Sequence, residues 1–442
     1  MQQKASINAL SRRSFLKSLG VSSTIIALAA CTQAQPATTV DVAAAEAISL
    51  ELWGWWDIRM AIYERVANAF TADNSDVTVN VVTLPGDQLQ QKIFSSIAAN
   101  TGPNLLKMAD STYFRMRDEN ILLPFPDDIF PESWIREMYP SFDLDSFGPY
   151  VLPTAASGTV LIYNKAMFEE AGLDPDTPPA TWDEFIEAAK ALTQRDSSGI
   201  TRAGFVPSPE FPCLSQVYQL GGNILKNSGD TQTATIDSDE VQRAFQHYAD
   251  LALVHEVWDP TFPGNAESVG TGIAAMTEEQ SWIIGEYAGT YADIFPNLGF
   301  APNPTPTGDV PPYTGYKSTV LSVSALSGHP DEDGASFRYL EYLYKTAGKD
   351  AFWELADLLS SAPVRSDLVN DPRLDANPAL KVVAGVVPSQ KDPVYLNEDL
   401  GTAWTDALSR MAIEKAPVTE VLAALNTQWQ GLLDQRLSKY MV

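Results

Sequence analysis

Residues 151–165 read V-L-P-T-A-A-S-G-T-V-L-I-Y-N-K, and this stretch decides how the chain is organised. An apolar run that ends at Pro153 and a second run over residues 159–163 are typical of short buried strands. Four small residues, 155–158, separate them, and small side chains permit backbone rotation at little steric cost. The pattern predicts a crossing between two bodies, and one more strand–helix unit inside a single sheet is the alternative.

The residues around this crossing predict α/β structure. Asn164 is placed to cap a helix that ends before Gly172. Upstream, strand and helix patterns alternate at residues 48–56, 60–71, 77–83, 88–100, 105–108 and 111–119, followed by an apolar return at 121–125. This order predicts a parallel sheet covered by helices on both faces, with ligands bound beyond the carboxyl ends of its strands.

Helix and strand signals continue beyond the crossing. Thr181 with Glu184 has the spacing of a capping box, and so does Asp237 with Glu240. A strand at residues 319–323, after a loop rich in Pro and Thr, is expected to be a second crossing. Other elements are expected at residues 272–276 (strand), 281–287, 331–344, 349–359, 399–413 and 418–437 (helices).

Composition limits the possible functions. A chain of 442 residues is expected to form two or three domains. Its formal charge of −27 argues against a nucleic-acid partner, because nothing in it balances the phosphate backbone. No apolar run beyond the N-terminus approaches the ~18 residues of a transmembrane helix.

The N-terminus has the features of an export signal. S-R-R-S-F-L-K at residues 11–17 is a twin-arginine pattern, and an apolar run leads to Leu-Ala-Ala-Cys at residues 28–31. The last four residues resemble a bacterial lipobox, which implies cleavage before Cys31 and a lipid on its sulfur. Residues 1–30 are then a signal peptide and residues 31–46 a flexible tether; a chance arginine pair before a frayed helix is the alternative. Cys213 is the only other cysteine, and its role stays open.

Short blocks along most of the chain resemble the family 1 extracellular solute-binding proteins, which are sugar-binding lipoproteins of ABC importers. They include W-G-W-W-D at 53–57, Y-N-K at 163–165, with G-L and T-W shortly after it, and A-A-M-T-E-E-Q-S-W at 274–282. The resemblance implies a non-enzymatic, extracytoplasmic protein without cofactors. It would be a lipid-anchored monomer that delivers a carbohydrate to permease subunits of the inner membrane.

The resemblance also implies an α/β fold of two lobes, the type II periplasmic-binding-protein-like fold. Each lobe is expected to hold a mainly parallel sheet flanked by helices, and the crossing strands to act as a hinge. The first lobe would comprise residues 47–155 plus 320–364, and the second residues 156–319 plus 365–442. Ligand would bind in the cleft between them.

Candidate ligand residues follow the predicted strands of the first lobe. Sugars offer apolar C–H faces and hydroxyl rims, so their sites need aromatic plates and planar polar groups. One of Trp55 and Trp56 is expected to be core, and Asp110 has the alternative role of a helix N-cap. The candidates are Trp55, Trp56, Asp57, Asp110, Ser111 and Tyr113.

The resemblance adds candidates in the second lobe and at the crossings. In the family, the Trp that matches Trp282 lies against a sugar ring. The alternative is that Trp282 packs in the hydrophobic core. Ser157 matches a hinge position that is acidic in the maltodextrin-binding branch, so maltodextrin is not carried over. Trp404 matches a stacking position, although Leu408 stands where a basic residue is expected. The further candidates are Glu210 and Phe211 in a proline-rich loop, and Gly315 and Tyr316 beside the second crossing.

Signals for an enzyme are weak. The three histidines have no metal-ligand spacing, and neither a G-x-S-x-G elbow nor a glycine-rich phosphate loop after a strand is present. Glu278 and Glu279 are adjacent and should point apart. Because carboxylate pairs can assemble from distant segments, a secreted polysaccharide-cleaving enzyme remains an alternative. A binding protein for a solute other than a sugar is another.

Overall fold

The computed structural model describes residues 48–440, except 56, 100, 208–212, 229–230, 263, 265–266, 316, 327–333 and 392–397. The predicted signal peptide, Cys31 and the tether lie outside the described residues. Glu46–Val442 forms one compact unit, and all that follows concerns this unit. No described helix combines the length and apolar character that a membrane span requires.

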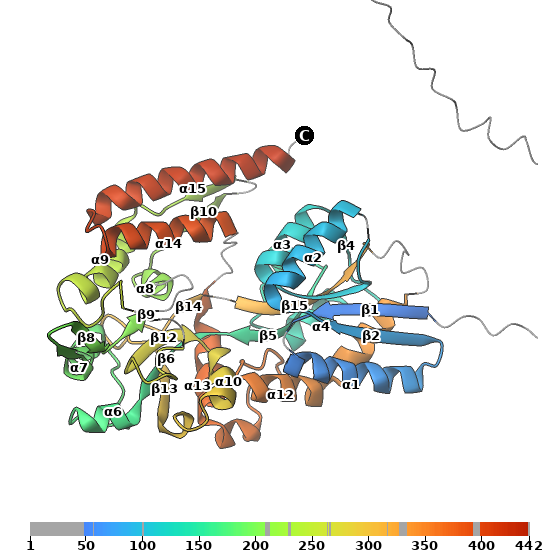
Figure 1. The fold of residues 1–442 in the computed structure, drawn as a ribbon. Coiled ribbons are helices and arrows are strands. Elements are labelled where there is room, and N and C mark those ends of the chain that lie inside the picture. Colours follow the sequence, from blue (N-terminus) through green and yellow to red (C-terminus); the bar gives the residue numbers. More distant parts are fainter. Residues whose placement is uncertain are drawn as a thin grey trace, which may run out of the picture. The chain divides into compact units, whose positions relative to one another are not determined.

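The first sheet has the predicted order of strands and helices. β1 (Ile48–Gly54), β2 (Val77–Thr83) and β3 (Leu105–Ala109) are each followed by a helix: α1 (Asp57–Asp73), α2 (Gly86–Ala99) and α3 (Asp110–Asp118). β1 pairs in parallel with both β2 and β3, as predicted. α1 lies on one face of this sheet and α2 and α3 on the other (Figure 1).

Later segments complete the first sheet, and one of them runs opposite to all the other strands. β15 (Lys317–Ser324) is antiparallel to β3, to β4 (Leu122–Leu123) and to β5 (Leu152–Ser157). The helices that accompany these strands are α4 (Glu132–Met138), α5 (Leu144–Phe147), α11 (Ala335–Glu341), a π-helical turn (Tyr342–Thr346) and α12 (Gly348–Leu359).

The second sheet runs in the order β13-β6-β12-β9 and is mixed. Its strands are β13 (Leu298–Pro302), β6 (Thr159–Asn164), β12 (Met276–Gln280) and β9 (Val206–Pro207). β6 is antiparallel to both neighbours, and only β12 and β9 pair in parallel. The expectation of a mainly parallel sheet is therefore wrong here. The reason is that β6 lies between β12 and β13 and runs against both. β12 is connected to β13 through α10 (Ile283–Thr290), which crosses over β6.

The predicted crossing between two bodies is confirmed. β5 belongs to the first sheet and β6 to the second, and Gly158 alone separates them. The carbonyl of Gly158 accepts a hydrogen bond of 3.0 Å from the backbone N–H of Ser281. The chain returns to the first sheet at β15, where Lys317 stands opposite Ser157. The single-sheet alternative is wrong, while the lobe boundaries remain a prediction.

Local capping follows the sequence in two of three predicted cases. Asn164 accepts a hydrogen bond from the Met167 N–H at the start of α6 (Lys165–Glu170), and Gly172 has a positive φ of 75° after it. Thr181 and Glu184 form a complete capping box on α7 (Trp182–Leu192).

The third predicted cap is wrong. α9 (Asp239–Leu253) begins after Ser238, so Glu240 is the second residue of the helix instead of the third and cannot reach back as a capping box requires. The strand expected at 272–276 is also displaced, because Gly272 has a positive φ of 77° and β12 instead continues through the polar residues 278–280.

The remaining elements pack around the second sheet. They are β7 (Gln194–Asp196), β8 (Gly199–Arg202), α8 (Leu214–Gln219), β10 (Leu225–Ser228), β11 (Thr231–Ala234), β14 (Thr314–Gly315), α13 (Pro378–Val386), β16 (Gln390–Lys391), α14 (Glu398–Ala412) and α15 (Val418–Tyr440). α14 and α15 lie on one side of the sheet with α8 and α9, and α10 and α13 lie on the other (Figure 1).

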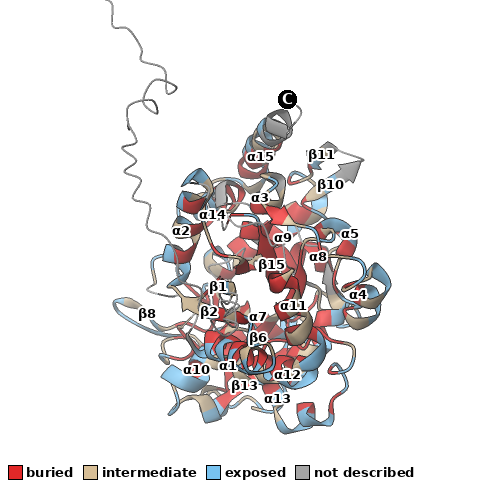
Figure 2. Ribbon diagram, turned by 90° about the vertical axis from the view of Figure 1, so that its right-hand side faces the viewer, coloured by how far each residue is buried: buried red, intermediate tan, exposed pale blue. Residues whose placement is uncertain are grey.

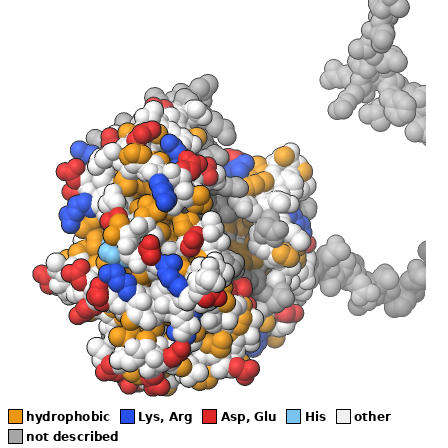
Figure 3. All heavy atoms as spheres, turned by 60° about the vertical axis from the view of Figure 1, so that its left-hand side comes forward, with side chains coloured by type: hydrophobic (Ala, Val, Ile, Leu, Met, Phe, Trp, Pro, Cys, Tyr) orange, Lys and Arg blue, Asp and Glu red, His pale blue; other side chains and the backbone are white. Residues whose placement is uncertain are grey.

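Buried and exposed residues separate as expected for a layered α/β unit. Figure 2 shows the central strands β6 and β15 as buried and the outer helix faces as exposed. Acidic side chains are spread over the face shown in Figure 3, with basic side chains interspersed among them. This surface agrees with the net charge of −27.

Candidate functional site

Trp282 lies at a strand-to-helix turn beside the crossing. β12 ends at Gln280, and Trp282 occupies the N-cap position of α10. The preceding residue, Ser281, donates its N–H to the carbonyl of Gly158, so the turn is tied to the crossing. The Trp282 side chain is half-buried and packs against the edge of the core. The predicted turn is confirmed, and contact with a ligand remains a prediction.

Trp55 occupies the matching place in the first sheet, directly after β1. Its side chain is half-buried, and the Nζ atom of Lys107 lies 3.6 Å from the centre of the ring. Trp56 lies outside the described residues. Each of the two sheets therefore presents a half-buried indole just past the carboxyl end of a strand, where ligands bind in α/β folds.

Asp57 and Asp110 are the first residues of α1 and α3. The structure does not describe the side chains of Asp57, Asp110 and Ser111, so their predicted roles stay predictions. One alternative is wrong, because Ala109 and not Asp110 holds the N-cap position of α3.

Tyr113 and Trp404 correct the sequence prediction. Tyr113 is fully buried, its ring lies 5.4 Å from that of Phe147, and its hydroxyl donates to the Phe147 carbonyl. Trp404 is also fully buried, with ring centres 4.6 Å from Phe245 and 5.8 Å from Trp429. Both rings lie on the core faces of their helices, so neither side chain is accessible to a ligand and we leave both out of the proposed site.

The other predicted residues are only partly placed. Ser157 is half-buried at the end of β5, opposite Lys317. Gly315 lies in β14, where it pairs with Lys391. Tyr316, Glu210 and Phe211 lie outside the described residues.

The sequence analysis did not identify two buried cations, Lys107 beneath Trp55 and Arg59, whose charge acts on Lys107. Lys107 is fully buried, and its ammonium has no hydrogen-bond partner among the described residues. Burial, with the nearby charge of Arg59, holds the pKa of Lys107 well below its usual range. Arg59 lies 3.5 Å from the Ser361 hydroxyl, and burial lowers its pKa to about 9. A lysine within the apolar strand L-L-K-M-A was the signal that could have found the first.

The second sheet carries two neighbouring carboxylates, Glu278 and Glu279, where the first sheet carries cations. The Nε2 of Gln216 donates to the Glu278 carboxylate at 2.7 Å. Burial raises the pKa of Glu278 to about 7, and the Gln216 hydrogen bond opposes part of that shift. Glu279, next to it, accepts a 2.7 Å bond from the backbone of Gln280. Successive side chains of a strand point to opposite faces, so these two carboxylates do not form an acid–base pair.

Cys213 is a free, buried thiol at the start of α8, with a left-handed backbone (φ 60°). Burial and the charge of Glu278 raise its pKa well above the usual value. Within the part of the chain that the structure describes, no group of three or more His, Cys, Asp or Glu side chains is arranged to hold a metal ion.

Comparison with known sequences finds a family that covers more than half of the chain. The sequence model of the family described as bacterial extracellular solute-binding protein matches residues 55–350. An arabinooligosaccharide-binding protein from Halalkalibacterium halodurans is 24% identical over 271 residues, which are 58% of this chain and 59% of that protein. The match thus spans less than two thirds of that relative. The sn-glycerol-3-phosphate-binding periplasmic protein UgpB of Escherichia coli K12 is 26% identical over 390 residues, 77% of this chain and 84% of that protein.

Comparison with solved structures concerns the fold. The cyclic alpha-maltosyl-1,6-maltose binding protein from Arthrobacter globiformis superposes with a TM-score of 0.72 at 19% identity, over 88% of this chain and all of that one. An ABC transporter solute-binding protein from Thermotoga lettingae, bound with alpha-D-tagatose, gives a TM-score of 0.71 at 21% identity, over 88% of this chain and 100% of that one. The predicted two-lobe α/β fold is confirmed.

Lys107→Met is expected to raise the melting temperature at pH 7. Methionine keeps the length of the side chain and removes an ammonium that lacks a hydrogen-bond partner in the described structure. Replacing buried charge with apolar groups is often neutral or stabilises by about 1–4 kcal/mol, and loss of the contact with Trp55 offsets about 1–2 kcal/mol of this. Calorimetry at several pH values measures the change.

The lowered pKa of Lys107 determines how the stability difference between Lys107→Met and wild type changes with pH. The pKa of Lys107 is lowered in the folded protein from 10.5, so the unfolded chain binds this proton more tightly. Wild-type stability therefore rises with pH between the two values, and the advantage of Lys107→Met should shrink as pH approaches about 10. Lys92→Met is the matched control, since the Lys92 ammonium lies 3.9 Å from the Trp53 ring but the residue is half-exposed. A lower melting temperature of Lys107→Met at every pH would contradict the prediction.

Proposed function

The chain belongs to the family of bacterial extracellular solute-binding proteins, and we propose that it captures a sugar or oligosaccharide for an ABC importer. In this proposal the ligand binds between two lobes, and the loaded protein delivers it to permease subunits in the cytoplasmic membrane. The protein itself performs no chemistry. The placement of Trp282 carries the proposal: a half-buried indole past the carboxyl end of a strand, beside the crossing.

The aromatic plates favour a carbohydrate. An indole offers a flat apolar face to the C–H side of a sugar ring, and the sheet edges supply two such rings, Trp55 and Trp282. The names of similar proteins include ligands of this class: an arabinooligosaccharide, a cyclic maltosyl-maltose and tagatose.

A polyol phosphate is a second candidate ligand. UgpB, which is named for sn-glycerol-3-phosphate, aligns over 84% of its length. The buried ammonium of Lys107 lies over the Trp55 ring, and the charge of Arg59 is close enough to lower the pKa of Lys107. Both side chains are at most 2% exposed, however, so an anion would reach them only if Trp55 moved. We therefore favour the neutral sugar.

The two sheets are proposed to belong to two lobes that move. The first lobe comprises residues 47–155 plus 320–364, and the second residues 156–319 plus 365–442. Gly158 and the start of β15 connect them, and a short link with small side chains lets two bodies rotate as units.

The N-terminus is proposed to export and anchor the protein. The twin-arginine pattern at residues 11–17 would direct the folded chain across the membrane, and a lipid on Cys31 would hold it at the outer face. Residues 31–46 would act as the tether. The protein would act as a monomer outside the cytoplasm.

Trp282→Ala is expected to abolish most ligand binding while the unliganded protein melts within a few degrees of wild type. Truncating a central aromatic anchor costs about 2–4 kcal/mol, which is roughly 30- to 1000-fold in affinity. A thermal-shift screen of sugars, oligosaccharides and glycerol phosphates identifies the ligand, and titration calorimetry then compares the variants. Trp282→Phe should keep part of the affinity.

Trp404→Ala is the matched control, because this indole is fully buried against Phe245 and Trp429. It should lose about 3–5 kcal/mol of stability. Wild-type affinity in Trp282→Ala would end the assignment of Trp282, and a collapse of its unliganded melting temperature would return this residue to the core. A screen in which only glycerol phosphates bind would replace the sugar with the second candidate.

Ligand is expected to close the two lobes. Small-angle scattering should show a smaller radius of gyration at saturating ligand than without it, because rotation about the crossing brings the lobes together. The melting temperature should rise in the same titration by mass action. A rise in melting temperature with an unchanged scattering curve would reject closure while leaving binding intact.

Cys31→Ala is expected to abolish incorporation of a labelled fatty acid, because the thiol is the proposed lipid attachment site. Arg12→Lys combined with Arg13→Lys should hold the precursor in the cytoplasm. Metabolic labelling and cell fractionation measure both effects. Equal labelling of Cys31→Ala and wild type would refute the anchor, and normal export of the double lysine variant would refute the twin-arginine route.

A further inference from the structure

The ammonium of Lys107 lies beneath the ring of Trp55. Its Nζ atom is 3.6 Å from the centre of the indole, well within the ~6 Å over which a cation is attracted to an aromatic face. Lys107 is 0% exposed, whereas Trp55 is half-buried. The inner face of the indole therefore contacts the cation, and Lys107 itself is out of reach of a ligand.

The end of β1 makes room for this arrangement. Gly54 ends β1 and lies beside Lys107 on β3, the strand with which β1 pairs in parallel. A Cβ atom at Gly54 would lie 3.2 Å from the Cβ of Lys107 and 2.5 Å from the sulfur of Met60. Because glycine has no side chain, the lysine can extend past β1 and reach the indole of Trp55.

Lys107 is an unfavourable residue for the stability of the fold. In the part of the chain that the structure describes, its ammonium has no hydrogen-bond partner. Burial and the positive charge of Arg59 both disfavour the protonated form, so the pKa of Lys107 lies well below its usual range. The contact with the indole offsets only part of the cost of burying a charge. A residue that costs stability beneath a candidate ligand ring points to a role in binding.

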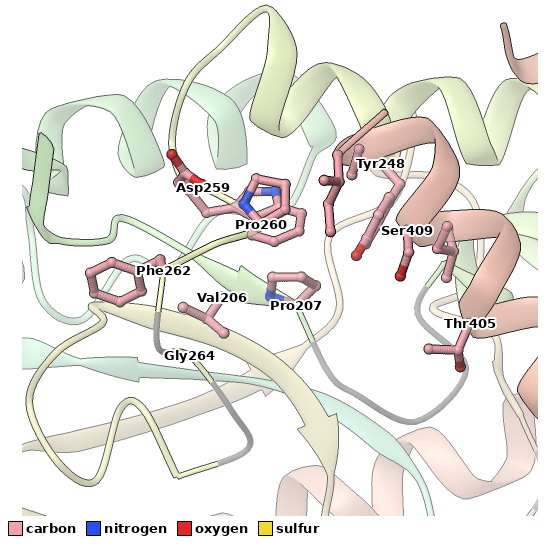
Figure 4. Close-up of a pocket in the computed structure, with 13 residues that line it drawn as sticks. Val206, Pro207, Tyr248, Asp259, Pro260, Phe262, Gly264, Thr405 and Ser409 are labelled. Atoms are coloured by element: carbon pink, nitrogen blue, oxygen red, sulfur yellow. The ribbon is translucent and has the colours of Figure 1, made fainter. Parts of the chain in front are cut away.

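The second sheet shows that an apolar wall at a sheet edge does not require a cation. β9 ends at a hollow of about 210 Å³, where Val206, Pro207 and Phe262 lie on one side (Figure 4). Among the described residues that line this hollow, the only charged one is an acid, Asp259. Lys107 therefore needs an explanation of its own.

We propose that Lys107 is a positioning residue of the ligand site, whose ammonium holds the indole of Trp55 in one orientation so that its outer face can receive a sugar. This inference rests on the proposed function and adds to it a residue that does not touch the ligand. Ordering a mobile side chain during binding weakens affinity roughly 2- to 10-fold. A ring that is already held in place avoids this loss.

Uncharged substitutions of Lys107 test the proposal. Lys107→Leu removes the cation and buries no other polar group, so its melting temperature should equal or exceed that of wild type. Its affinity for sugar should nevertheless fall roughly 2- to 10-fold. Lys107→Met should show a similar or smaller loss, because a methionine sulfur can itself contact the ring. A residue needed only for the fold would lower stability and affinity together.

Titration calorimetry measures the affinities. The probes are tagatose and α-1,4-glucan, β-1,4-mannan and α-1,5-arabinan oligosaccharides, and the one that wild type binds most tightly is used for all variants. Lys92→Leu is the matched control. The Lys92 ammonium lies 3.9 Å from the ring centre of Trp53, but Trp53 is only 5% exposed and is not a candidate for ligand contact. This variant should bind the sugar as wild type does.

A double-mutant cycle shows whether Lys107 acts through the ring. Trp55→Ala should lose at least about 10-fold in affinity, and adding Lys107→Leu to it should cause no further loss.

Fluorine NMR of protein labelled with 5-fluorotryptophan observes the ring without ligand. The Trp55 signal, assigned by its absence in Trp55→Phe, should shift in Lys107→Leu and stay in place in Lys92→Leu.

The outcomes separate this inference from the proposed function. Wild-type affinity in both Lys107→Leu and Lys107→Met would overturn the positioning role, and so would a loss that adds to that of Trp55→Ala. Wild-type affinity in Trp55→Ala would overturn it as well, and in all three cases the proposed function stands. Failure of both uncharged variants to fold would assign Lys107 to the fold instead of the site. If no probe binds wild type, the proposed carbohydrate function fails and this inference fails with it.

Discussion

The pairing of β5 with β15 and of β6 with β12 and β13 is the constraint on which the architecture depends. Buried backbone groups must find partners, and β5 finds them in the first sheet and β6 in the second. Gly158 alone remains between the two ladders, and even its carbonyl is used, by the N–H of Ser281. The link between the sheets is therefore short and anchored at both ends. The same hydrogen bond places the turn that carries Trp282 beside this link.

The candidate site combines half-buried aromatic rings with buried polar groups below them. Under Trp55 lies Lys107, whose ammonium has the indole face as its contact and no hydrogen-bond partner in the described part of the chain. In the second sheet the buried Gln216 donates its Nε2 to the Glu278 carboxylate, while its Oε1 has no partner among the described residues. Buried polar groups of this kind destabilise a fold unless they are paired, and proteins retain them mostly near functional sites. Their position at both sheet edges agrees with binding there.

The sequence was sufficient for features that depend on local chemistry. The strand at 77–83, the capping box of Thr181 and Glu184, and the crossing at Gly158 were all predicted correctly, because periodicity, cap spacing and small residues act over a few positions. Strand direction in the second sheet was not predictable, because β6 is a continuous buried apolar run and such a run does not reveal the direction of its neighbours. The sequence cast doubt on Trp404, where Leu408 replaces an expected basic residue, but it could not show that Trp404 is buried, because tertiary packing decides this. Lys107 was visible as a charge in an apolar strand and was passed over.

Cys213 has a practical consequence. The chain contains two cysteines, and a form that begins after residue 46 retains Cys213 alone. Burial and a raised pKa keep that thiol protonated and out of contact with reagents in solution. A single cysteine introduced at an exposed position would therefore take up a maleimide dye almost exclusively, without removal of the native residue. The protein is therefore suited to conversion into a fluorescent sensor. A dye attached beside the crossing would detect ligand binding through a change in its emission.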